Sequence, residues 1–260
     1  MSGCTLPLAQ KSSEVRATIW RRRSQLSHQI ILNESAPLGY RDAKRRSRAA
    51  GRLTRVSKTH VRVGTFEFFA NRDDVDGVRV LADYVIARLY PEAQSAAQPY
   101  LELLKAVIAR TAKLIASWQL VGFIHGVMNT DNTSIAGETI DYGPCAFMDA
   151  YHAGQVFSSI DHQGRYAYAN QPRIAHWNLM RFAESLLPLL DADGSIAVDA
   201  AKAALESYPA QFESALAEGF RAKVGFARHR EGDLAFIAEL LERMAEGLAD
   251  CTLTFPAAVP

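Results

Sequence analysis

The chain has 260 residues with a net charge of +1, and its content of 48% hydrophobic and 22% charged residues is ordinary for a globular protein. It contains no apolar run of the roughly 18 residues that a transmembrane helix needs, and its first thirty residues lack the apolar segment of a secretory signal. The cysteines Cys4, Cys145 and Cys251 form neither a CxxC pair nor a Cys/His pattern, which argues against a disulfide framework or a zinc site. We therefore expect a cytoplasmic protein without a membrane partner, or a mitochondrial one if the source is eukaryotic.

The charge is distributed unevenly along the chain. Residues 1–62 contain 14 of the 29 Lys and Arg but only 3 of the 28 acidic residues, so this part carries +11 and the remainder −10. A basic arm of this kind binds anionic partners or is a solvated tail, and the tail is the favoured interpretation for residues 1–50. We do not expect nucleic-acid binding, because the basic clusters lack interleaved aromatic residues.

The N-terminal part divides at about residue 50. Residues 1–50 show neither a helical nor a strand period and are predicted to form a basic, poorly ordered segment, followed by a mainly helical lobe over residues 51–260. Residues 64–69 (GTFEFF) are interpreted as an extended segment that turns into a helix. Asp73 or Asp74 is predicted to cap the next helix, because a short carboxylate there accepts from free backbone N–H groups. This helix is expected to run to about Tyr90 and to end at Pro91.

Further along the chain, apolar residues recur every three or four positions from Leu101 to Trp118, which predicts an amphipathic helix. Later stretches with helical spacing are 174–190, 198–216 and 233–248. Pro188 and Pro209 are expected to break two of them. Between the helical blocks, residues 122–170 are rich in Gly, Asn, Asp and Ser, and a connection of this length usually carries function. The fold class predicted is mainly α with a small β element in this segment.

Two strings in this segment carry the candidate chemistry, His125–Asn132 (HGVMNTDN) and Thr139–Pro144 (TIDYGP). Their acid and amide side chains are hard oxygen ligands that suit Mg²⁺, with Mn²⁺ as an alternative. Because Mg²⁺ usually takes one or two protein oxygens together with substrate phosphates, Asn132 and Asp141 would be a sufficient set.

The spacing also compares with the protein-kinase pattern, in which a His precedes the catalytic Asp by two residues and a metal-binding Asn by seven. Asn132 lies seven residues after His125. The position of the catalytic Asp, two residues after His125, is occupied by Val127, which cannot accept a proton. The Asp-Tyr-Gly sequence that begins at Asp141 resembles the Asp-Phe-Gly metal loop of kinases. Taken alone, this pattern is also compatible with a set of Asx-turns in a structural loop.

A wider set of strings resembles one protein family. These strings are LTRVSKTHVRVGTFEFF (Leu53–Phe69), HGVMNTDN (His125–Asn132), TIDYGP (Thr139–Pro144), DHQGRY (Asp161–Tyr166), NQP (Asn170–Pro172) and WNLMR (Trp177–Arg181). In this order they are similar to the SelO family, also called YdiU, closely over residues 51–190 and more loosely beyond. Members of that family resemble protein kinases in fold, bind ATP in a flipped orientation and transfer AMP to protein hydroxyl groups. The resemblance implies a kinase-like C-terminal lobe.

The resemblance also implies roles for five residues. Asp131 matches the proton acceptor of the family. Asn132 and Asp141 match its Mg²⁺ ligands, and Asp141 also lies against the nucleotide. Arg55 and Arg62 match two nucleotide-binding arginines, although either could instead form a surface ion pair. These roles suit AMP transfer, because a carboxylate can deprotonate the attacking hydroxyl and guanidinium groups offset charge on the leaving pyrophosphate.

The sequence departs from the family pattern in two respects. Family members are longer, and their N-terminal lobe carries a glycine-rich phosphate loop and a nucleotide-binding lysine that we do not find before Arg55. The C-terminal end of the family is also absent after Pro260. We therefore expect a protein adenylyltransferase that uses ATP and modifies Ser, Thr or Tyr hydroxyls of protein partners, with weak ATP binding and little turnover. The alternative is a pseudoenzyme or binding module derived from that family.

Overall fold

The computed structural model describes residues 30–31, 54–55, 57–226, 228, 230–251 and 254–255. Internal contacts divide the chain into two units, Met1–His60 and Val61–Pro260. In the first unit, β1 (Ile30–Ile31) and β2 (Thr54–Arg55) pair in antiparallel orientation, with Ile30 opposite Arg55. The predicted disorder of residues 1–50 falls almost entirely outside the described residues, so it stays a prediction, as does a boundary at residue 50.

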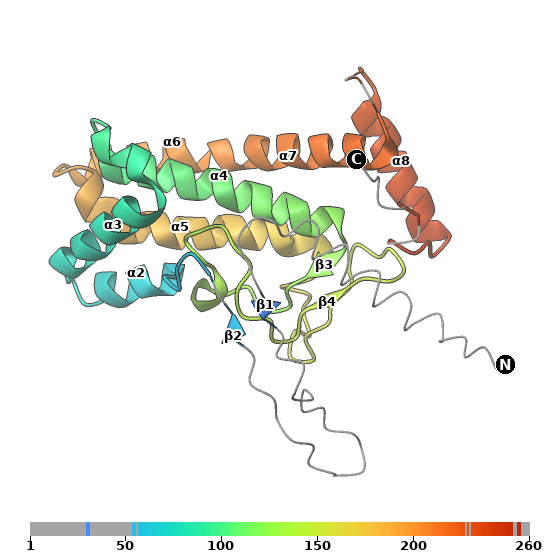
Figure 1. Ribbon diagram of the computed structural model, residues 1–260, viewed down its shortest axis with the longest axis horizontal. Coiled ribbons are helices and arrows are strands. Elements are labelled where there is room, and N and C mark those ends of the chain that lie inside the picture. Colours follow the sequence, from blue (N-terminus) through green and yellow to red (C-terminus); the bar gives the residue numbers. More distant parts are fainter. Residues whose placement is uncertain are drawn as a thin grey trace, which may run out of the picture. The chain divides into compact units, whose positions relative to one another are not determined.

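The second unit is mainly helical (Figure 1). Its α-helices are α2 (Val63–Ala70), α3 (Val75–Leu89), α4 (Pro99–Leu120), α5 (Gln171–Leu190), α6 (Gly194–Leu205), α7 (Ser207–Val224) and α8 (Asp233–Glu246). A short 3-10 helix, η1 (Pro91–Ser95), joins α3 to α4. The predicted fold class, mainly α with a small β element, is confirmed. Within the described residues, no helix combines the length and apolar character needed to cross a membrane.

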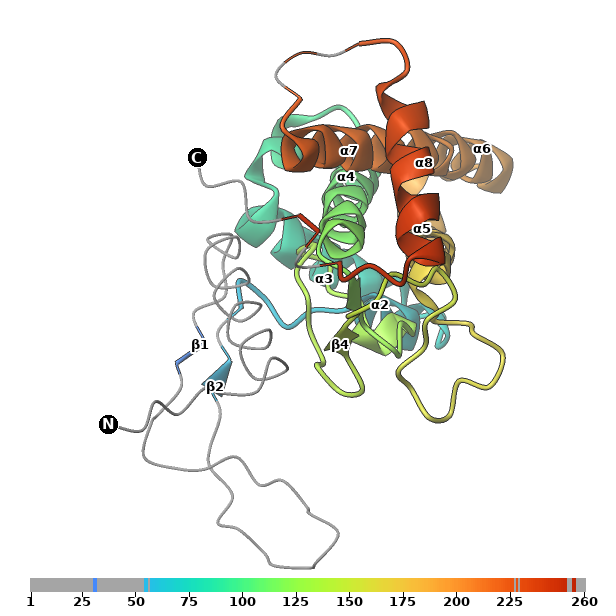
Figure 2. The same ribbon diagram turned by 90° about the vertical axis from the view of Figure 1, so that its right-hand side faces the viewer.

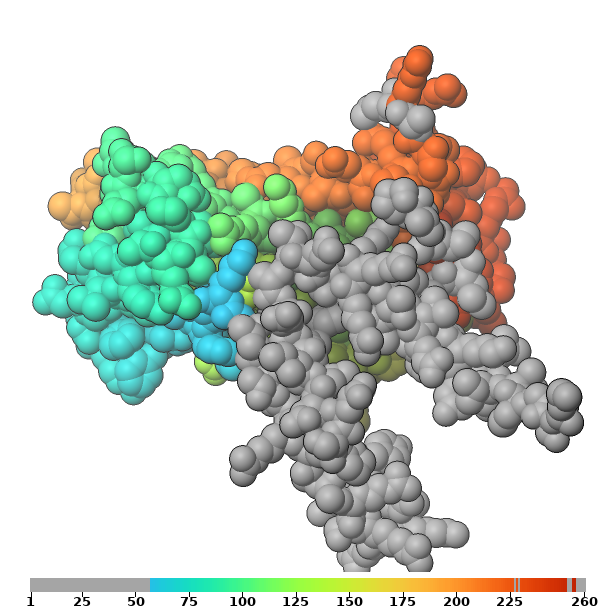
Figure 3. Space-filling model, in the orientation of Figure 1, coloured from blue at the N-terminus to red at the C-terminus, as the bar shows by residue number. Residues whose placement is uncertain are grey.

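Helix α4 lies at the centre of the second unit. It packs against α5, α6 and α7, and α2 packs against α5 on the other side (Figure 1). Helix α8 crosses the end of α7, as the turned view in Figure 2 also shows. At the surface, atoms of α4 fill a strip between α3 and α7 (Figure 3). The long connection between α4 and α5 thus joins two helices that pack against each other.

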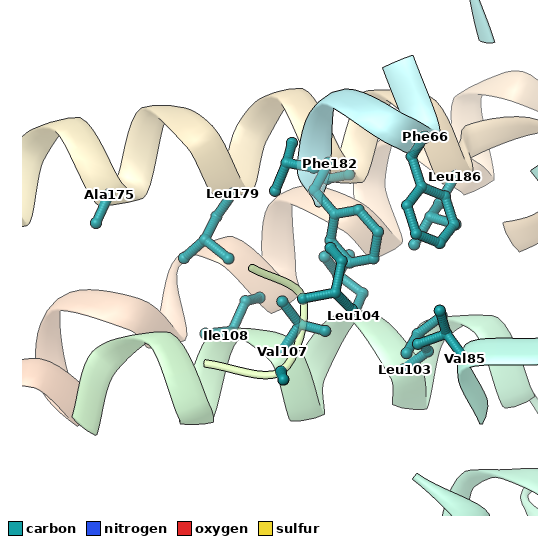
Figure 4. Close-up of a cluster of buried hydrophobic side chains, with 14 of the residues drawn as sticks. Phe66, Val85, Leu103, Leu104, Val107, Ile108, Ala175, Leu179, Phe182 and Leu186 are labelled. Atoms are coloured by element: carbon teal, nitrogen blue, oxygen red, sulfur yellow. The ribbon is translucent and has the colours of Figure 1, made fainter. Parts of the chain in front are cut away.

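The main hydrophobic core lies between α4, α5 and the N-terminal helices (Figure 4). Phe66 from α2 meets Phe182 from α5 edge to face, with 4.9 Å between ring centroids, and both side chains are fully buried. Leu104 and Ile108 approach the same cluster from α4. Such aromatic contact and burial stabilise the fold by removing apolar surface from water. The cluster fixes α2 on α5, which matters because the candidate site lies beside the start of α2.

Two of the predicted helix ends agree with the structure. Asp74 is the N-cap of α3, and its carboxylate accepts a hydrogen bond of 2.8 Å from the backbone N–H of Gly77. Helix α3 ends at Leu89, and the 3-10 helix η1 begins two residues later at Pro91. These ends are set by local chemistry, namely a short acceptor at the start and a missing N–H at the end.

Three local expectations were wrong. Residues 64–69 belong to a helix, because Val63 and Phe66 share a buried face and Thr65 accepts from the backbone N–H of Arg62 at the helix start. Helix α5 continues through Pro188 to Leu190. Pro209 lies in the first turn of α7, where a helix tolerates a missing N–H, and the break falls between α6 and α7 instead.

The connection between α4 and α5 contains the short β element. Strands β3 (Phe123–Ile124) and β4 (Ala146–Phe147) pair in antiparallel orientation, with Phe123 opposite Phe147. Two 3-10 turns accompany them, η2 (Thr130–Asn132) and η3 (Tyr168–Asn170). The predicted position of the β element, around the candidate metal loop, is confirmed. The kinase-like arrangement stays a prediction.

Candidate functional site

Asp131 and Asn132 lie next to each other in the 3-10 turn η2. The Nδ2 of Asn132 donates a hydrogen bond of 3.0 Å to the backbone carbonyl of Val127. This bond occupies the amide nitrogen and leaves the Asn132 Oδ1 as the acceptor end of the side chain. The turn thus presents a carboxylate and an amide oxygen from consecutive residues.

The start of α2 holds this turn from the other side. Arg62 and Ser134 form an antiparallel bridge, and the backbone N–H of Val63 donates to the carbonyl of Thr133 at 2.9 Å. The guanidinium of Arg62 donates through Nη1 to the backbone carbonyl of Asp131 at 2.6 Å. Arg62 and the turn with Asp131, which are far apart in sequence, are therefore held together by these hydrogen bonds.

Asp141 follows in a second, tightly turned loop. Its φ angle is 57°, in the left-handed region that L-residues enter at a cost, and its carbonyl accepts from the backbone N–H of Gly143 at 2.9 Å. The preceding carbonyl, of Ile140, lies 2.8 Å from Nε2 of His125. A non-glycine residue in this conformation is typical of functional loops whose surroundings hold them in place.

His125 connects the two loops from within the core. Its side chain is 1% exposed and packs against the rings of Trp118 and Phe123. Burial lowers the pKa of His125, while the carbonyl of Ile140 and the negative charge of Asp141 act in the opposite direction. The imidazole is therefore neutral at pH 7, with the proton on Nε2 where it meets the Ile140 carbonyl. This geometry favours a loop-holding role over acid–base chemistry.

Helix α5 anchors the same segment through two fully buried amides. Gln171 accepts from the backbone N–H of His125 and donates to the carbonyl of Phe123, both at 2.9 Å. Asn178 donates to the carbonyl of Met128 at 3.0 Å and to the hydroxyl of Thr133 at 2.8 Å. These bonds fix both flanks of the turn that carries Asp131 and Asn132.

The sequence model of the family described as "Protein adenylyltransferase SelO" matches residues 26–258 of this chain. The chain belongs to the SelO family. Three similar relatives share the name "Protein nucleotidyltransferase YdiU". They come from Nitrobacter hamburgensis (61% identical over 208 residues), Bradyrhizobium diazoefficiens (61% over 203) and Cereibacter sphaeroides (60% over 203). The aligned regions cover 78–80% of this chain and 41–42% of each relative, so the chain spans about two fifths of the length of these proteins.

Four of the five site residues predicted from the SelO resemblance lie in the second unit. Arg62 contacts Asp131 directly, and Asn132 is adjacent in the same turn. His125 connects Asp141 to this turn. Its backbone begins the segment that contains the turn, and its ring contacts the carbonyl of Ile140, the residue before Asp141. Arg55 occupies β2 in the first unit, and its side chain lies outside the described residues. The structure does not test the roles predicted for these residues.

The donor set suits a magnesium ion that is shared with phosphates. Asn132 and Asp141 offer an amide oxygen and a carboxylate, which are hard ligands. Among the described residues, no group of three or more His, Cys, Asp and Glu side chains could hold a metal ion by itself. An ion bound by Asn132 and Asp141 would therefore need further oxygens from a nucleotide or from water, which is how Mg²⁺ usually binds.

Sequence reasoning did not identify the residues that support this site. Gln171 and Asn178 were noticed only as members of family strings. A signal was present for Asn178, since it lies between Ile174 and Phe182 on the apolar face of α5, where a polar residue is unexpected. Buried polar residues on an apolar helical stripe are hydrogen-bonded in most structures, and here the partners are the loop carbonyl and hydroxyl.

Proposed function

We propose that this chain carries the metal- and phosphate-binding centre of a protein adenylyltransferase, which transfers AMP from ATP to a Ser, Thr or Tyr hydroxyl of a protein. The observation that supports it best is the arrangement of Arg62, Asp131 and Asn132 around one turn. Family membership and the names of the relatives support the reaction class.

The proposed chemistry assigns one role to each side chain. Asp131, which is exposed at the surface of the turn, accepts the proton of the incoming hydroxyl. The hydroxyl oxygen forms a bond to the α-phosphorus, the bond from that phosphorus to the bridging oxygen breaks, and pyrophosphate leaves. Arg62 uses one guanidinium nitrogen to hold the carbonyl of Asp131, and its other N–H groups are proposed to bind phosphate oxygens. Arg55 is proposed as a second phosphate contact.

Asn132 and Asp141 would hold Mg²⁺, or Mn²⁺ in its place, against the phosphates. When bound, the ion would neutralise charge that develops on the leaving group. His125 contributes by keeping Ile140 and Asp141 in their tight turn. We further propose a cytoplasmic location, which agrees with the bacterial sources of the relatives.

Transfer from ATP labelled at the α-phosphate to protein, with and without Mg²⁺, tests the proposal. Asp131→Ala should lower the transfer rate by about 10²- to 10⁴-fold, the usual contribution of a general base. Asp199→Ala is the matched control, because Asp199 is an exposed acid on α6, away from the site. A wild-type chain that transfers no label, or an Asp131→Ala variant as active as the wild type, would contradict the proposal.

Nucleotide binding is measured separately by thermal unfolding. At about 100 times Kd, Mg·ATP should stabilise the chain by about 2.7 kcal/mol, which is about 5–10 °C for a domain of this size. The shift should vanish in Asp141→Ala and persist in Asp131→Ala. Stabilisation of the wild type without label transfer would indicate instead a binding module or pseudoenzyme derived from the family.

A further inference from the structure

The first turn of α2 touches the side chain of Asp131. A Cβ atom placed on Gly64 would lie 2.1 Å from Oδ1 of Asp131 and 3.0 Å from its Cγ. Real Cβ atoms essentially never approach another atom within 3.0 Å. The carboxylate of Asp131 thus occupies the space that any side chain at position 64 would need.

The backbone of Gly64 gives no other reason for a glycine. It lies within α2, and it is not among the glycines with positive φ. In such a position alanine favours the helix over glycine, because glycine loses more backbone freedom. Among the described residues, the three atoms nearest to a Cβ on Gly64 all belong to Asp131, so the close approach of Asp131 is the feature that favours a glycine here.

The main chain around Asp131 is held against the start of α2 by two hydrogen bonds. Arg62 holds the carbonyl of Asp131, and Val63 holds that of Thr133. The same Cβ on Gly64 would also lie 3.3 Å from the backbone nitrogen of Asp131, which is already tight. A side chain at position 64 must therefore rotate the carboxylate away or separate α2 from the turn.

We propose that Gly64 is a positioning residue, which fixes the Asp131 carboxylate over the first turn of α2. This inference rests on the proposed function for its catalytic meaning. A general base that is held in one place gives a higher reaction rate than a mobile one, because small displacements of a reacting group lower rates strongly.

A double-mutant cycle of Gly64→Ala and Asp131→Ala tests the placement without any assay of activity. In the wild-type background, Gly64→Ala should lower Tm. In the Asp131→Ala background, where the carboxylate is gone, the decrease should disappear, because helix propensity favours alanine and only the 3.3 Å contact with the backbone nitrogen remains. Gly194→Ala is the matched control, since Gly194 begins α6 and a Cβ there meets nothing within 4 Å. It should not lower Tm. Equal effects of Gly64→Ala in both backgrounds would overturn the placement.

Steady-state AMP transfer tests the catalytic part. Gly64→Ala should lower kcat by about 10²-fold and leave the KM for Mg·ATP and the Mg·ATP shift in Tm nearly unchanged, because the three atoms nearest to a Cβ on Gly64 all belong to Asp131. General loosening of the fold would instead reduce nucleotide binding as well. A kcat equal to that of the wild type would overturn the inference. A wild-type chain that transfers no AMP would overturn the proposed function, while the unfolding cycle would still decide where the carboxylate lies.

Discussion

At the scale of single residues, Asp141 combines a strained backbone with a side chain that we propose as a metal ligand. Its φ of 57° lies in the region where L-residues lose roughly 1–2 kcal/mol relative to a right-handed conformation. Glycine occupies this region freely, and Asp tolerates it better than alanine does. The sequence thus keeps an acidic residue where backbone conformation alone would favour glycine.

This strain predicts that stability and nucleotide binding separate at position 141. Asp141→Gly should be more stable than Asp141→Ala by about 1 kcal/mol, because alanine retains the left-handed cost. Both variants should lose the Mg·ATP shift in Tm, since both lack the carboxylate. Urea unfolding and thermal unfolding with Mg·ATP provide the two measurements. A glycine variant less stable than the alanine variant would show that the backbone at this position is not strained.

The buried imidazole of His125 predicts a pH dependence of stability. Burial lowers its pKa in the folded state, so below about pH 6.5 the unfolded chain takes up a proton that the folded chain resists. The contribution of His125 is therefore complete above about pH 6.5 and is lost as the pH falls toward the folded-state pKa.

The variant His125→Gln isolates this effect, because glutamine also offers an Nε2–H but does not titrate. The decrease in urea midpoint between about pH 7.5 and pH 5.5 should be smaller in the variant than in the wild type. An unchanged decrease would mean that other groups account for the pH dependence.

At the scale of elements, α5 holds the turn that contains Asp131 and Asn132 through Asn178. Replacing Asn178 by leucine leaves the buried Met128 carbonyl without its donor, which should cost about 1–3 kcal/mol. The Mg·ATP shift in Tm should also decrease, because the turn loses its inner support. Ser185→Ala is the control on the same helix, since the buried hydroxyl of Ser185 donates a hydrogen bond to the carbonyl of Arg181 within α5 itself. A leucine variant with a full Mg·ATP shift would contradict the link between α5 and the turn.

Element types were predictable from the sequence where local chemistry decides them. The spacing from Leu101 to Trp118 and the cap at Asp74 both predicted helices that the structure contains. Helix α2 was mistaken for a partly extended segment, because its eight residues are stabilised by contact with α5 more than by their own propensity. The expected break at Pro188 failed because one missing N–H near a helix end is tolerated when the helix is packed.

The candidate site was predictable only in part. Oxygen-rich strings indicated Asn132 and Asp141, and the family resemblance added Asp131 and the two arginines. The contact between Asp131 and Gly64 could not be predicted, because the two residues are 67 positions apart and meet only through the packing of α2. The signal at Gly64 itself was ambiguous, since a glycine before an aromatic run also suits a turn.

At the scale of the whole molecule, the described core is confined to one of the two units. Both clusters of buried apolar residues contain only residues after His60. A chain that begins at Val61 should therefore fold with the helices of the second unit, and its Tm should lie within a few degrees of that of the full chain. Circular dichroism and thermal unfolding would test this. A fragment without cooperative unfolding would show that residues 1–60 contribute to stability.

The same fragment lacks Arg55, so it also tests the proposed phosphate contact. Its Mg·ATP shift in Tm should be smaller than that of the full chain, and Arg55→Ala in the full chain should reproduce the reduction. A full shift in both proteins would remove Arg55 from the proposed site without affecting the roles of Arg62 and Asp131.

The amide of Gln171 has a consequence for association between molecules. By accepting from the N–H of His125 and donating to the carbonyl of Phe123, it reproduces the bonds that a neighbouring strand would make. The outer edge of β3 is thereby closed to an added strand, and unpaired sheet edges are where aggregation through strand addition begins. Gln171→Ala would leave the N–H of His125 and the carbonyl of Phe123 without these partners.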